Sequence, residues 1–166
     1  GQQLEAKNNL AWTYYFQKKY DLANELFQPL LESDLATGHK AKICFQYASD
    51  AQKIGDYRAA IKWHEQLMDR WPHPEFINKS RFWIAESLFL LNQTPDTKIS
   101  AADKQKAILL FGQNLNLKKP IELENTHYHR GWFLLELGKS SRAEADFKWL
   151  QKNNAKYGKD IDLTLI

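Results

Sequence analysis

The sequence predicts an all-α protein: a solenoid of about eight helices paired into four antiparallel hairpins. Apolar residues recur with the period of an amphipathic helix along most of the chain. Small residues recur in pairs twelve apart, with a turn midway between the two members. These pairs are Ala11 and Ala23, Ala48 and Ala60, and Gly131 and Ala143. Such pairs let the two helices of a hairpin cross closely, and their repetition at a spacing of 36 or 37 residues predicts hairpins that stack.

The first two hairpins are delimited by turn and breaker residues. We expect their helices at roughly 3–17, 20–32, 39–54 and 57–70. The linker at 33–38 contains capping residues and a glycine. Pro72 and Pro74 prevent the second hairpin from continuing.

The third hairpin carries an insertion. Its small residues, Ala85 and Ala107, are twenty-two apart, as though ten residues had been added. Ser100 and Asp103 resemble a capping box at the start of its second helix. We expect the remaining helices at roughly 75–91, 101–116, 121–137 and 140–154. The inserted loop near 93–103 is a second candidate contact surface, and the apolar tail at 157–166 either caps the array or, as we favour, begins a following element.

Four stretches of the chain resemble degenerate tetratricopeptide repeats, at about 4–37, 41–74, 78–119 and 124–155. In that family helix A carries a large apolar, a small and an aromatic or large residue, as in Leu10, Ala11 and Tyr14. Helix B carries alanine and, four residues later, an aromatic, as in Ala23 and Phe27. The family's early helix-A tryptophan is replaced here by Lys7, Cys44, Arg81 and His127, and its helix-B aromatic is replaced in the second repeat by His64. The resemblance implies a right-handed solenoid over residues 1–156.

The resemblance also implies a binding site, because the A helices of these arrays line a concave groove. The matching positions are rich in aromatic and basic residues, and they give the partner-binding candidates Asn8, Trp12, Tyr15, Phe16, Lys42, Phe45, Lys53, Lys79, Trp83, Tyr128, His129 and Trp132. Aromatic side chains bury a large area at little entropic cost, and lysines beside them favour acidic groups. We therefore expect a non-enzymatic scaffold that binds an extended or helical segment of a partner protein.

Composition and motifs argue against several other functions. The net charge of +3 comes from 23 basic and 20 acidic residues, and no basic stripe recurs with the repeat, so we expect no nucleic-acid partner. His127 and His129 point about 200° apart on a helix, which disfavours shared metal ligation. Cys44 lies at a packing position, and no glycine-rich phosphate loop is present. We expect no catalytic residue, metal or cofactor, and no membrane-spanning helix.

Two other functions remain open. Aromatic platforms with polar neighbours also bind glycans, which would fit a polysaccharide-binding or export-associated repeat module. The chain could equally be the regulatory domain of a longer enzyme. Chaperone recognition through a carboxylate-gripping residue set is not expected, because only Lys79 matches that set. The chain begins with Gly1 and its only methionine is Met68, so we expect a piece of a longer protein. Its abundant asparagine, glutamine and lysine suggest a bacterial source, in the cytoplasm or periplasm.

Overall fold

The computed structural model describes residues 1–153 and 155–166, and all regular structure in this part of the chain is helical. The predicted all-α repeat array is confirmed. It comprises α1 (Gln2–Phe16), α2 (Tyr20–Leu31), α3 (Thr37–Lys53), α4 (Tyr57–Arg70), α5 (Pro74–Gln93), α6 (Ala101–Leu115), α7 (Leu123–Glu136) and α8 (Ser140–Lys152), followed by the short 3-10 helices η1 (Gly158–Asp160) and η2 (Leu163–Leu165). Helix starts and ends agree with the sequence-based ranges to within two residues.

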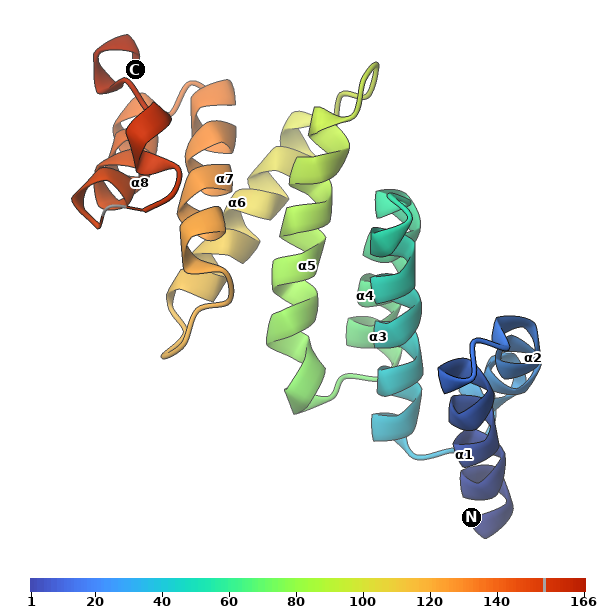
Figure 1. The fold of residues 1–166 in the computed structure, drawn as a ribbon. Coiled ribbons are helices and arrows are strands. Elements are labelled where there is room, and N and C mark those ends of the chain that lie inside the picture. The colour runs from blue at the N-terminus through green and yellow to red at the C-terminus, as the bar shows by residue number, and fades with distance from the viewer. Residues whose placement is uncertain (154) are drawn as a thin grey trace.

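The helices pack in chain order, so that the N-terminus and the C-terminus lie at opposite ends of an elongated array (Figure 1). The first helices of the four hairpins, α1, α3, α5 and α7, lie toward the viewer in Figure 1; we call them the A helices. The second helices, α2, α4, α6 and α8, are the B helices. Contacts also join α3 to α5 and α5 to α7, so these three A helices form a layer with a face of its own.

The paired small residues lie where the helices of each hairpin cross. Seven of the eight are alanines with no exposed surface. The eighth, Gly131, is also buried, and a Cβ placed on it would lie 2.6 Å from the ring of Phe147 on α8. The small residues therefore lie at close crossings of the two helices, as predicted from their spacing.

Side-chain caps mark the starts of α4 and α6. The Ser100 hydroxyl accepts a hydrogen bond from the backbone N–H of Asp103 at 3.0 Å, and the Asp103 carboxylate accepts one from the backbone of Ser100, which completes the predicted capping box of α6. The Asp56 carboxylate accepts the backbone N–H of Ala59 and caps α4. Gly55, which directly precedes Asp56, has a φ of 79° and adopts the left-handed conformation common after a helix end.

The buried apolar residues form two clusters rather than one. Core 1 joins the first two hairpins to the start of α5 and runs from Ala11 to Phe76. Core 2 joins the rest of α5 to the last helices and runs from Phe82 to Ile161. Met68 on α4 packs against both. Because Ile161 is buried in core 2, the C-terminal segment lies on the last hairpin.

The inserted loop between α5 and α6 is attached to the array. Ile99 reaches into core 2 and is nearly buried. Asp96 has a φ of 59°, the left-handed conformation of a tight turn. Among the described residues, no helix has the length and apolar character needed to cross a bilayer.

Candidate partner-binding face

Two clefts lie side by side between α3 and α5, on the face of the A helices. The first has a volume of about 500 Å³ and is lined by Ala36, Gly38, His39, Lys42, Phe45, Gln46, His73, Glu75 and Phe76. The second has a volume of about 480 Å³ and is lined by Phe45, Ser49, Gln52, Lys53, Tyr57, Trp83 and Leu90. Because Phe45 lines both, they form one discontinuous groove along α3, which we call the α3–α5 groove.

The sequence of α3 explains why one of its faces is free to line this groove. The groove-lining residues of α3 recur every three or four positions, from Gly38 to Lys53, and so share one side of the helix. The other side is buried in the array and carries small or medium apolar residues: Ala41, Ile43, Cys44, Ala48 and Ala51. Cys44 is a fully buried packing residue, and burial raises the pKa of its thiol to about 12.

Aromatic rings form the centre of the groove. The ring of Phe45 lies 5.1 Å from that of Phe76 on α5 and 5.3 Å from that of His64 on α4. Farther along, the Gln52 side-chain amide donates a hydrogen bond to the Ser87 hydroxyl at 3.1 Å, which ties α3 to α5. The Phe45 ring is therefore supported by neighbouring rings from two helices, α4 and α5.

The charge of the groove is carried mainly by lysine. The Lys42 ammonium lies 4.7 Å from the ring centroid of Trp12, in a cation–π arrangement. The Lys53 ammonium lies 3.3 Å from the Asp50 carboxylate, and the Lys79 ammonium lies 4.0 Å from that of Glu75. These pairs are solvent-exposed and weak, so the lysines remain free to exchange partners.

His64 is a buried polar group that packs against the groove residue Phe45. Its Nδ1 lies 3.1 Å from the Ser80 hydroxyl of α5, and its Nε2 has no hydrogen-bond partner among the described residues. The side chain is fully buried. Burial lowers the pKa of this imidazole to about 4, because charging it would require taking an ion out of water.

The structure divides the sequence-predicted site residues into three groups. Lys42, Phe45, Lys53 and Trp83 line the α3–α5 groove. Tyr15, Phe16, Lys79, Tyr128 and Trp132 are exposed or half-buried but lie outside it. Asn8, Trp12 and His129 are buried, with only 2%, 8% and 7% of their surfaces exposed.

The three buried residues contact other parts of the chain and expose little surface to a partner. Trp12 belongs to core 1, with its ring 4.9 Å from that of Phe27. The Asn8 amide faces His39 Nδ1 at 3.3 Å. His129 stacks on Phe89 at 3.7 Å, and its Nδ1 lies 2.7 Å from the Glu86 carboxylate. A helical repeat shows which face such residues occupy but not how far the neighbouring hairpin covers them.

Sequence reasoning missed several groove residues. His39, Gln46, His73, Glu75, Tyr57 and Leu90 also line the two clefts. Gln46 could have been found, because it lies four residues after Lys42 on the same face. His73 and Glu75 come from the linker and the first turn of α5, and only the packing of the second hairpin on the third brings them to α3.

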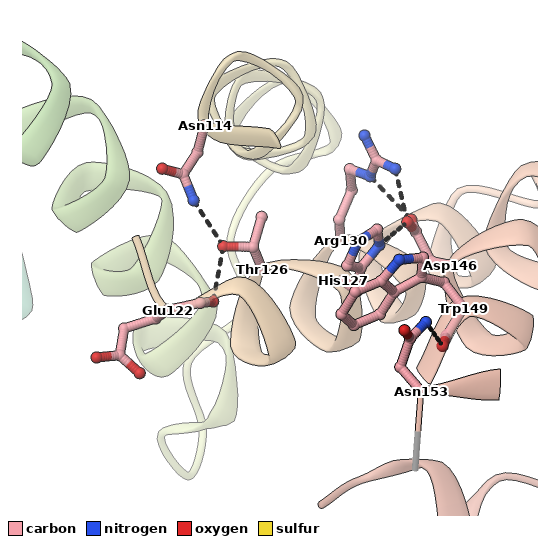
Figure 2. Close-up of polar contacts among 8 residues, drawn as sticks. All are labelled: Asn114, Glu122, Thr126, His127, Arg130, Asp146, Trp149 and Asn153. Carbon is pink, nitrogen blue, oxygen red and sulfur yellow. Dashed lines mark hydrogen bonds and ion pairs between the residues drawn. The ribbon is translucent and has the colours of Figure 1, made fainter. Parts of the chain in front are cut away.

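The two histidines of α7 engage different elements. Asp146 of α8 lies between His127, at 2.7 Å, and Arg130, whose guanidinium donates to both carboxylate oxygens (Figure 2). His127 also stacks on Trp149 at 4.1 Å. His129 instead faces Glu86 on α5. Among the described residues, no group of three or more histidine, cysteine or acidic side chains is arranged to hold a metal ion.

Comparison of this chain with protein-family models, with curated proteins and with solved structures gives no match.

Proposed function

We propose that this protein is a non-enzymatic scaffold that binds a segment of a partner protein in the α3–α5 groove. The observation that carries the proposal is the pair of adjoining clefts that share Phe45 and have lysines along their rims. Each cleft falls within the usual size range of a ligand pocket, about 300–1,000 Å³. Because they follow one helix, they suit a partner segment that lies along α3.

Aromatic and basic groups have separate roles in this mechanism. Phe45 and Trp83 are the apolar anchors, since large rings in a supported site contribute most to interface affinity. Lys42 and Lys53 attract acidic side chains of the partner, which raises the association rate and sets its direction along the groove. Lys79, whose ammonium lies 4.0 Å from the Glu75 carboxylate of the first cleft, is a further exposed cation beside the groove.

A charge-reversal experiment tests this proposal. Lys42→Glu and Lys53→Glu together should lower affinity for the partner by tenfold or more without loss of fold, because both side chains are exposed. Lys62→Glu and Lys152→Glu provide the matched control, since they change the net charge equally at exposed positions on α4 and α8. The measurement is affinity capture from source lysate with wild type and both variants, followed by calorimetry on the captured protein.

The salt dependence of binding gives a second readout. Wild-type affinity should fall as ionic strength rises, and this dependence should be weaker in the Lys42/Lys53 variant. A captured protein that binds the Lys42/Lys53 variant as tightly as the wild type would contradict the groove assignment. Capture of oligosaccharide in place of protein would favour the glycan-binding alternative.

A further inference from the structure

A pocket lined by three tyrosines lies between the first two hairpins, beyond the end of the α3–α5 groove. It has a volume of about 340 Å³ and is lined by Tyr15, Tyr20, Asn24, Tyr47, Asp50, Lys53 and Ile54. We call it the tyrosine pocket. Lys53 lines both this pocket and the second cleft, so the two sites are neighbours.

The aromatic walls of the tyrosine pocket are held in place by neighbouring rings. Tyr15 and Tyr20 have ring centroids 5.3 Å apart and planes at 66°, so they form two steeply angled walls. The Tyr47 ring packs against Trp63, 4.8 Å away, and against Phe27, 6.2 Å away. A ligand would therefore meet aromatic walls that are already assembled, which lowers the entropic cost of binding.

One carboxylate lies among these rings. The Tyr15 hydroxyl donates to both oxygens of Asp50, at 2.9 and 3.0 Å, and the Gln46 amide donates to Oδ1 at 3.0 Å. These bonds fix the carboxylate inside the pocket. The Lys53 ammonium approaches the same oxygen at 3.3 Å from a largely exposed side chain, so the protein supplies its own weakly held cation here.

The mouth of the tyrosine pocket is apolar and exposed. Ile54 is 82% exposed and Tyr20 is 50% exposed, and the neighbouring Phe16 is 73% exposed. Apolar side chains gathered in this way around a pocket mark a binding surface more often than a random part of the surface. Methyl groups on a ligand would find apolar contacts at this rim.

We propose that the tyrosine pocket binds a methylated ammonium group. Aromatic rings attract a cation through their quadrupoles, and a carboxylate among them supplies the opposite charge. An unmethylated ammonium is strongly hydrated and resists transfer into such a site, whereas methylation spreads the charge over apolar surface. This site shares only Lys53 with the α3–α5 groove, and the proposal does not depend on the groove's function.

The decisive test compares a cation with its neutral isostere. Choline and 3,3-dimethylbutan-1-ol have nearly the same shape, and only choline carries a charge. Each is titrated into the full chain, and binding is followed by calorimetry and by the NMR shifts of the ligand methyl groups. Choline should bind at least tenfold more tightly than the alcohol; equal binding would overturn the proposal.

Substitutions test whether choline binds in the tyrosine pocket. Tyr20→Leu keeps the apolar bulk but removes one ring, and should weaken choline binding about tenfold; Asp50→Asn should weaken it similarly. Tyr14→Leu is the matched control, because Tyr14 lies on α1 outside the pocket. If Tyr20→Leu and Tyr14→Leu bind choline equally well, the site lies elsewhere and the proposal fails.

Substitution of Lys53 distinguishes ammonium binding in the tyrosine pocket from partner binding in the α3–α5 groove. Lys53→Gln removes the competing internal cation and should strengthen choline binding, whereas it should weaken an acidic partner in the α3–α5 groove. A pentapeptide containing trimethyllysine, compared with its unmethylated form and with choline, distinguishes the source of the ligand. Tighter binding of the methylated peptide points to a modified protein, and tighter binding of choline points to a small molecule; if neither binds, the proposal is overturned.

Discussion

At the scale of single residues, His64 shows how a helical-repeat pattern accommodates a polar side chain. It lies four residues after a small residue on a B helix, a place taken by Phe27, Phe111 and Phe147 in the other repeats. All four side chains are buried. The sequence pattern predicts the position of the imidazole, and only the structure shows that Ser80 is its one hydrogen-bond partner among the described residues.

The burial of His64 predicts a pH dependence of stability. Its pKa is about 4 in the folded protein and about 6.5 when exposed, so between these values the unfolded chain binds a proton that the folded chain does not. The contribution of His64 to the free energy of unfolding should therefore be greatest above pH 6.5 and fall as pH drops toward 4, by up to about 1.4 kcal/mol per pH unit.

The measurement is urea unfolding of wild type and His64→Phe at pH 7, 5.5 and 4.5. The variant loses the hydrogen bond to Ser80, which lowers its stability at every pH, but it should lose less additional stability on acidification. Other titrating groups affect both proteins equally. If the two stabilities fall in parallel, His64 is not the group that titrates in this window.

At the scale of helices and their connections, most of the fold could be predicted because the hairpins follow local signals. Apolar periodicity, capping residues, prolines and paired small residues all act over a few turns of chain. The start of α7 shows the limit of this reasoning. We expected a helix from about residue 121, but Ile121 is held outside the helix by two hydrogen bonds with the Asn114 side chain, and Glu122 has a φ of 42°. A side chain on the preceding helix sets this boundary.

The same limit applies to the candidate site. Residue types and helical spacing predicted Lys42, Phe45 and Trp83 on one exposed face, and all three line the α3–α5 groove. Whether a residue on that face is open or covered depends on how tightly successive hairpins approach, which the spacing does not encode. Trp12 is covered by Phe27 of its own hairpin and by Lys42 of the next one, while Trp83 is only half-buried.

The crossing of α7 and α8 predicts that Gly131→Ala is destabilising. The added methyl would lie 2.6 Å from the fully buried ring of Phe147, and overpacking of this kind costs about 1–3 kcal/mol. Gly112→Ala is the control, because its methyl would meet only Arg130 at 3.6 Å, and alanine favours a helix. Thermal and urea unfolding of both should show loss for Gly131→Ala and no loss for Gly112→Ala.

A second substitution identifies the cause. Phe147→Leu in the Gly131→Ala background makes room for the methyl group, so the double variant should lose less stability than the sum of the two single changes. Strict additivity would mean that the cost of Gly131→Ala arises elsewhere.

At the scale of the whole molecule, the first and last hairpins differ in the side-chain contacts that stabilise them. In the last hairpin, Asp146 of α8 forms ion pairs with His127 and Arg130 of α7. Ile161 of the C-terminal segment packs in core 2. The first hairpin places Trp12 in core 1 with its indole N–H lacking a partner among the described residues. In a stacked array each hairpin depends mainly on its neighbours, so these differences affect local stability.

This asymmetry predicts the order of local opening. Backbone amides of α1 and α2 should exchange with solvent deuterium faster than those of α7 and α8, and α5 should be the slowest, since it contributes to both cores. Hydrogen exchange followed by mass spectrometry on the full chain measures this order. Faster exchange in α7 and α8 than in α1 and α2 would contradict it.

The boundary between the two cores crosses α5, between Phe76 and Phe82, and the α3–α5 groove spans that boundary. A partner lying in both clefts would contact Phe76, which is part of core 1, and Trp83, which packs against core 2. Its binding free energy would then oppose the separate melting of either core, in proportion to the logarithm of its concentration. Occupancy of the groove would thus couple the two cores, so that they unfold more cooperatively than in the free protein.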